Sequence, residues 1–212
     1  MEKLEVKVAE QLMQIKAIKL QPTNPFTWAS GWKSPIYCDN RKTLSHPELR
    51  TWLKEQFSKL IRDKHPDVDV IAGVATGAIA QGALVAEELG LPFVYVRSAP
   101  KGHGLTNLIE GDLKPRTKVV VIEGLISTGG SSLKAVEAIR NFGCEVLEMF
   151  AIFTYGFKVA EDNFAKANVP LTVLGNYKTL VDVAVNSGYV SQDDVNTLAE
   201  WRKDPGSWNK GY

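Results

Sequence analysis

The residues best suited to chemistry lie at positions 119–132, which read Val-Val-Val-Ile-Glu-Gly-Leu-Ile-Ser-Thr-Gly-Gly-Ser-Ser. An apolar run ends there in the carboxylate of Glu123, and a turn rich in glycine and hydroxyl groups follows it. Glycines let the backbone approach a ligand closely, and the free N–H groups at a helix start bind phosphate. A carboxylate instead suits sugar hydroxyls. The pattern therefore predicts a site for a phosphorylated sugar; the alternative is an ordinary helix start whose glycines serve only the turn.

Two other segments have residues that suit the same kind of ligand. Residues 73–78, Gly-Val-Ala-Thr-Gly-Ala, predict a second turn that can present N–H groups to an anion, although helix-on-strand packing explains its glycines equally well. Residues 97–111 carry Arg97, Lys101 and His103 among glycines, and long polar loops of this kind commonly form active-site lids. Such cations would neutralise a polyphosphate leaving group and the closed lid would exclude water. The alternative for this segment is a solvated surface loop.

The spacing of apolar residues places these turns between alternating strands and helices. Strands that are apolar along their length are expected at residues 68–74, 93–97, 117–123, 146–155 and 171–174. Helices are expected at residues 2–18, 45–63 (with Ser45 as the cap), 78–89, 129–141 and 159–167, with two more between 179 and 203. Such alternation predicts an α/β fold with a parallel sheet covered on both faces, whose ligands bind at the carboxyl ends of the strands.

Composition excludes several classes of function. The chain has 212 residues, and 25 Lys and Arg against 24 Asp and Glu give a net charge of +1, so no general attraction to nucleic acid or anionic lipid is expected. Cys38 and Cys144 are too few for a disulfide framework or a zinc site, and both are interpreted as buried small hydrophobes. The N-terminus lacks an apolar run of signal-peptide length, so a soluble cytoplasmic protein is expected.

Taken together, these segments resemble the type I phosphoribosyltransferases. Residues 123–132 after their strand are similar to the signature that binds phosphoribosyl pyrophosphate (PRPP), and the match covers the chain from about residue 10 to 212. Residues 26–41, with Ser-Gly at 30–31 and Lys-Ser-Pro-Ile-Tyr at 33–37, resemble the hood of the orotate-specific branch, and Lys101-Gly-His103-Gly resembles its lid. The resemblance implies a central, mainly parallel sheet flanked by helices, with a helix and hood at residues 1–45 and an α/β core with C-terminal helices at 46–212.

The resemblance also implies a reaction and residues for it: orotate and PRPP give orotidine 5′-phosphate and pyrophosphate in de novo pyrimidine synthesis. It implies Mg²⁺ held mainly by PRPP and water, a homodimer whose lid acts in the neighbouring site, and no nucleic-acid or membrane partner. Arg97, Lys101 and His103 would be catalytic, and Ser127 would lie beside the orotate. For the orotate carboxylate we expect Arg41 and backbone N–H groups of the hood as partners, which the resemblance itself does not imply. The implied PRPP-binding residues are Thr76, Glu123, Gly124, Leu125, Ile126, Ser127, Thr128, Gly129, Gly130 and Ser131.

Two departures from the family pattern bear on activity. The signature usually carries two adjacent acids, and here Gly124 replaces the second. Some relatives have an arginine where this chain has Tyr155 and a second base where it has Ser98, so the orotate carboxylate needs other partners. Two rival functions follow: a phosphoribosyltransferase for a purine, which the hood argues against, and a PRPP-binding regulator without catalysis, which Gly124 favours.

Overall fold

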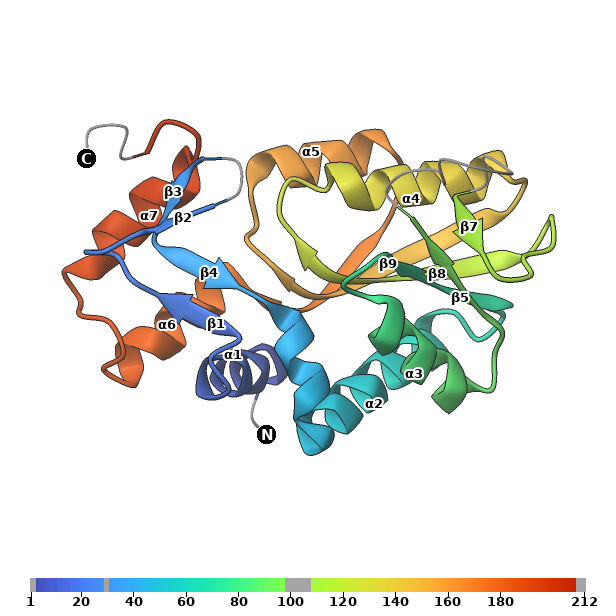
Figure 1. The fold of residues 1–212 in the computed structure, drawn as a ribbon, viewed down its shortest axis with the longest axis horizontal. Helices are drawn as coiled ribbons and strands as arrows, with labels where there is room; N and C mark the ends of the chain where they lie inside the picture. The colour runs from blue at the N-terminus through green and yellow to red at the C-terminus, as the bar shows by residue number, and fades with distance from the viewer. Residues whose placement is uncertain (1–2, 29–30, 98–107, 209–212) are drawn as a thin grey trace.

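A six-stranded sheet carries the site. The computed structural model describes residues 3–28, 31–97 and 108–208, and its main sheet has the order β10-β9-β8-β5-β6-β7 (Figure 1). All neighbouring pairs are parallel except β6 with β7. The strands are β5 (Val70–Val74), β6 (Phe93–Val96), β7 (Ile109–Glu110), β8 (Lys118–Ile126), β9 (Glu145–Thr154) and β10 (Leu171–Asn176). The predicted fold class is therefore confirmed, with one short antiparallel strand at the edge.

Helices cover both faces of the sheet, as strands with apolar residues on both sides require. In β8, Val119 and Val121 belong to one hydrophobic cluster, whereas Val120 and Ile122 belong to the other, because successive side chains point to opposite faces. Figure 1 shows α4 (Gly130–Asn141) and α5 (Lys158–Lys166) on one face and α2 (Pro47–Lys64) and α3 (Ile79–Leu89) on the other. Among the described residues, no helix combines the length and apolar character needed to cross a membrane.

The hood is built from four short strands next to the N-terminal helix. β1 (Ile18–Leu20) pairs with β4 (Ile36–Cys38), and β2 (Phe26–Thr27) pairs with β3 (Lys33–Ser34), both antiparallel. A 3-10 helix, η1 (Asn40–Ser45), then leads into α2. At this end of the molecule Figure 1 also shows α1 (Leu4–Gln14), α6 (Tyr177–Asn186) and α7 (Asp194–Lys203), so the C-terminal helices lie beside the hood.

The structure corrects two predicted element boundaries and one predicted burial. α2 has His46, not Ser45, as its N-cap, because Pro47 opens the helix and holds the preceding residue extended. β8 continues past Glu123 to Ile126, so the carboxylate lies within the strand and not at its end. Cys144 is buried as expected, but Cys38 is only partly buried.

A buried carboxylate outside the predicted site connects one helix to two strands. Glu148, near the start of β9, accepts hydrogen bonds from Lys64 Nζ and His65 Nε2, both at 2.7 Å, and from the Thr172 hydroxyl. Burial alone would raise the pKa of Glu148, but the hydrogen bonds from Lys64, Thr172 and His65 outweigh it and hold that pKa below its ordinary value. The ionised carboxylate therefore ties the end of α2 to β9 and β10.

Candidate active site

The strand order reverses between β5 and β8, and the two turns that are predicted to bind anions follow these strands. β6 pairs with one side of β5, and β8 pairs with the other. Such a reversal leaves a crevice above two neighbouring strand ends, and α/β proteins bind ligands there. The β5–α3 turn and the β8–α4 turn follow these two strands, so the topology places both predicted turns at one crevice.

Glu123 is buried against the helix that follows its strand. Only 9% of the residue is exposed, its Oε1 accepts the Gly124 N–H at 2.6 Å, and its Oε2 accepts the Ser132 hydroxyl at 2.9 Å. Burial raises the pKa of this carboxyl, although the hydrogen bonds from Gly124 and Ser132 oppose the rise. Glu123 therefore fixes the first turn of α4 as well as lying beside the crevice.

Gly124 is held by the hood. Its carbonyl oxygen accepts a hydrogen bond of 2.6 Å from the Asn40 side-chain amide, which is itself buried. A Cβ atom built at position 124 would meet no other heavy atom within 4 Å, and the backbone there is not in the left-handed region. Position 124 thus has room for a side chain, so the absence of an acid there has no steric cause.

The turn between β8 and α4 has the features of a phosphate site. Gly129 has φ +79°, and a side chain there would come within 2.7 Å of the Phe164 ring, so the turn requires glycine at this point. The Thr128 and Ser131 side chains are exposed beside the helix start, whereas the Asn163 amide donates to the Thr128 carbonyl at 3.0 Å and holds the turn from behind. Exposed hydroxyls and helix N–H groups can bind a phosphate together.

The preceding residues of the predicted signature have a different environment. Ile126 is fully buried, and its carbonyl accepts the Tyr155 N–H at 3.1 Å, so it offers structural contacts within the sheet. Leu125 and Ser127 are partly exposed. The signature therefore alternates residues that build the sheet with residues that face the crevice.

The turn after β5 also leaves its polar groups accessible. Thr76 and Gly77 are exposed, the peptide bond between Ala75 and Thr76 is cis, and α3 begins at Ile79. Gly73, in contrast, is needed for packing, because a Cβ there would lie 2.8 Å from the Ala78 carbonyl oxygen. Thr76 is thus the side chain of this turn that can contact an anion.

A pocket of about 350 Å³ lies between the hood and the end of β8. Its lining residues are Thr27, Trp28, Tyr37, Cys38, Leu125, Ser127 and Tyr155. The Trp28 and Tyr155 rings stack with centroids 5.6 Å apart and planes 23° apart. Burial raises the pKa of Tyr155 well above its ordinary value, so its hydroxyl stays protonated. A flat, largely apolar wall of this kind suits a planar heterocycle.

The C-terminal helix supports this pocket from behind. Trp201 of α7 is fully buried, and it meets the rings of Trp28 and Tyr155 edge-on. The ring centroids are 5.8 Å apart for Trp28 and 5.6 Å apart for Tyr155. The next residue, Arg202, donates to the carbonyls of Tyr155 at 3.2 Å and Gly156 at 2.9 Å. The position of the pocket's aromatic wall therefore depends on α7.

Of the predicted basic residues, the structure describes Arg97 and Arg41, and each has a carboxylate partner. Arg97, at the end of β6, pairs with Glu110 at 3.4 Å, and Lys101 and His103 lie outside the described residues. The Arg41 side chain is 64% exposed and makes two hydrogen bonds to Asp39, at 2.7 and 3.1 Å. Arg41 is not among the residues that line the aromatic pocket.

Asn40 is a site residue that the sequence analysis missed. It lies two residues after the last strand of the hood, and its side chain joins the hood to Gly124, 84 positions along the chain. The sequence did contain a signal for Asn40, since an asparagine shortly after a strand commonly stabilises a turn through its side chain. The partner could not be inferred, because nothing local specifies a contact over that distance.

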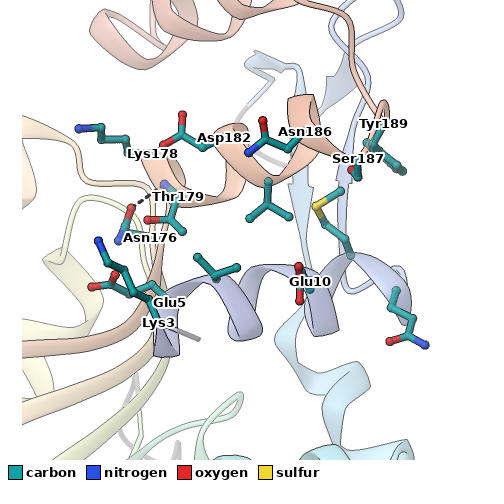
Figure 2. A pocket seen from close by; sticks show the side chains of 14 residues that line it. Lys3, Glu5, Glu10, Asn176, Lys178, Thr179, Asp182, Asn186, Ser187 and Tyr189 are labelled. Carbon is teal, nitrogen blue, oxygen red and sulfur yellow. Dashed lines mark hydrogen bonds between the residues drawn. The ribbon is translucent and has the colours of Figure 1, made fainter. Parts of the chain in front are cut away.

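A larger hollow, of about 930 Å³, lies elsewhere, between α1 and α6. Figure 2 shows that its lining mixes opposite charges, with Lys3, Glu5 and Glu10 facing Lys178 and Asp182. None of the predicted site residues lines it, and its mixed charge does not suit a phosphorylated ligand.

Comparisons with known proteins agree with this geometry. A phosphoribosyl transferase domain model matches residues 44–187. The orotate phosphoribosyltransferase of Bacteroides thetaiotaomicron is 64% identical over 211 residues and that of Phocaeicola vulgatus is 65% identical over 211, each match covering 100% of both chains. The crystal structure of orotate phosphoribosyltransferase from Aeropyrum pernix superposes with a TM-score of 0.75 at 27% identity, covering 87% of this chain and 99% of the other. The chain therefore belongs to the orotate phosphoribosyltransferases of the phosphoribosyltransferase family.

Proposed function

We propose that this chain transfers the phosphoribosyl group of PRPP to orotate, giving orotidine 5′-phosphate and pyrophosphate in de novo pyrimidine synthesis. The observation that carries the assignment is the aromatic pocket, which shares Leu125 and Ser127 with the signature turn. A base and a sugar phosphate therefore have adjoining places on one short segment. A purine enzyme or a non-catalytic regulator has no comparable support among the relatives named above.

Each part of PRPP has a proposed place. The 5-phosphate binds at residues 128–131, where exposed hydroxyls meet the start of α4, and the pyrophosphate approaches Thr76. The Glu123 carboxylate accepts hydrogen bonds from the Gly124 N–H and the Ser132 hydroxyl, and a carboxylate has further acceptor capacity for a ribose hydroxyl. Orotate stacks in the pocket beside Ser127.

Catalysis then rests on position and charge. Breaking the bond at the anomeric carbon develops positive charge on the ribose and negative charge on the departing pyrophosphate, and preorganised groups stabilise both. We propose that Arg97, Lys101 and His103 approach the pyrophosphate from a lid, and that the lid acts in the neighbouring site of a homodimer. The place of Arg97 at the end of β6, directly before residues 98–107, supports this role.

We propose that Mg²⁺ arrives with PRPP and is held mainly by that ligand and by water. Among the described residues, no three His, Cys, Asp or Glu side chains cluster in a way that could hold a metal, and the pyrophosphate turn offers a hydroxyl and backbone groups. Mg²⁺ usually keeps several waters and binds substrate phosphates. When bound, the ion would neutralise charge on the pyrophosphate, and Thr76 would hold that end of the ligand.

The experiment follows the absorbance of orotate after PRPP and Mg²⁺ are added to the protein. Loss of orotate with one pyrophosphate released per orotate consumed supports the assignment. The matched controls omit PRPP or replace orotate with adenine. Consumption of adenine alone would establish the purine rival, and binding of PRPP without consumption of either base would establish the regulator.

A further inference from the structure

The pyrimidine pocket lacks a charge that its proposed substrate requires. Orotate carries a carboxylate on its ring, whereas none of the described residues that line the pocket carries a formal charge. A carboxylate that leaves water for an aromatic pocket needs a cation or several donors. A cationic partner therefore has to come from the rim of the pocket.

Lys33 is a cation in a suitable place. In the hairpin of β2 and β3 it stands directly opposite Thr27, so the two side chains project from the same face. The Lys33 ammonium donates to the Thr27 hydroxyl at 3.0 Å, and Thr27 lines the pocket. Within the described part of the chain, no carboxylate lies within ion-pair distance of Lys33, and its ammonium has further donors to offer.

The two nearby arginines have other partners. Arg41 makes its paired hydrogen bonds to Asp39, and Arg202 donates to the two carbonyls at the end of β9. Turning either guanidinium toward the pocket would break two hydrogen bonds that it already makes within the protein. Recruiting Lys33 requires only that a carboxylate share the ammonium with the Thr27 hydroxyl.

We propose that Lys33 pairs with the carboxylate of the pyrimidine and selects a carboxylated base over an uncharged one. This inference rests on the proposed function. Lys33 stands on the hood, so the hood supplies the charge that distinguishes the substrate while the aromatic wall supplies stacking.

Direct binding of two nucleotides tests this pairing. Orotidine 5′-phosphate and uridine 5′-phosphate differ only in the carboxylate, and both occupy the phosphate turn. By calorimetry, the wild-type protein should bind orotidine 5′-phosphate about 10- to 150-fold more tightly, the range expected for one charge-assisted hydrogen bond. Lys33→Met should remove most of that ratio and leave the affinity for uridine 5′-phosphate unchanged, whereas Lys33→Arg should retain most of it.

Lys42→Met is the matched control, because the Lys42 ammonium donates to the Lys16 carbonyl and not to a pocket residue. An unchanged ratio in Lys33→Met, or an equal loss of affinity for both nucleotides, would overturn the proposal. So would a ratio that falls in Arg41→Met and not in Lys33→Met. A wild-type protein that prefers orotidine 5′-phosphate through Lys33 but consumes no orotate would refute the proposed catalysis and leave the pairing intact.

Discussion

Replacing Gly124 with aspartate tests whether the missing second acid limits the enzyme. A side chain at this position has open space around it, since a Cβ would meet no heavy atom within 4 Å. Successive residues of a strand point to opposite faces, so an acid at 124 projects from the face opposite to that of Glu123. We therefore expect Gly124→Asp to add a carboxylate near the proposed ribose site without a clash at its Cβ atom.

The size of the effect follows from one charge-assisted hydrogen bond to a ribose hydroxyl. Such a bond contributes about 1.5–3 kcal/mol, which corresponds to an increase of about 10- to 150-fold in kcat/KM for PRPP. A second carboxylate next to Glu123 also adds repulsion in the unliganded protein, so its free energy of unfolding should fall by about 1 kcal/mol at neutral pH.

The assay measures kcat/KM for PRPP at saturating orotate, together with urea unfolding. Gly124→Asn and Gly124→Ala are the matched variants. Asparagine keeps the shape of aspartate without its charge, and alanine adds only a methyl group. The reasoning predicts a gain for aspartate, a smaller gain for asparagine and none for alanine. Equal kcat/KM in Gly124→Asp and the wild type, with folding intact, would refute it and show that Glu123 alone suffices.

Three further predictions concern residues that support the site or the sheet. Asn40→Ala leaves the buried Gly124 carbonyl without its 2.6 Å donor, so urea unfolding should show a loss of about 1–3 kcal/mol and kcat/KM for PRPP should fall. Trp201→Phe leaves a gap behind the aromatic wall, so the KM for orotate should rise more than the KM for PRPP in steady-state assays. Glu148→Gln should lower the free energy of unfolding by about 1–3 kcal/mol near pH 7. This difference should shrink as the pH falls below about 4.3, the pKa of an unfolded glutamate, because a carboxyl whose pKa is depressed by folding stabilises the fold above the unfolded pKa and not below both values. Chemical unfolding at several pH values checks the last prediction, and a difference that does not change with pH would contradict it.

The sequence was most informative where local rules decide the structure. The alternation of apolar strands with helices predicted the sheet, and the glycines of residues 123–132 predicted a turn that does require Gly129. What the sequence could not supply were contacts between residues distant along the chain and individual charge pairs. The burial of Glu123 depends on Ser132 in the next helix, and the contact between Asn40 and Gly124 joins positions 84 apart. The pairing of Arg41 with Asp39, two residues away, was likewise not predicted, and the role of Arg41 in binding orotate stays a prediction.

The period of a strand explains why the two positions of the acid pair are not equivalent. Glu123 faces α4 and bonds Ser132, whereas Gly124 contacts Asn40 only through its backbone carbonyl and has open space where a Cβ would stand, so one position stabilises the turn and the other can take a side chain. Losing the acid at 123 would strip the Gly124 N–H and the Ser132 hydroxyl of their acceptor and weaken the start of α4. Losing the acid at 124 removes no contact that the fold uses. Position 124 is therefore the one where a side chain can affect ligand binding and spare the fold, which is why a single aspartate should raise kcat/KM for PRPP without rebuilding the site.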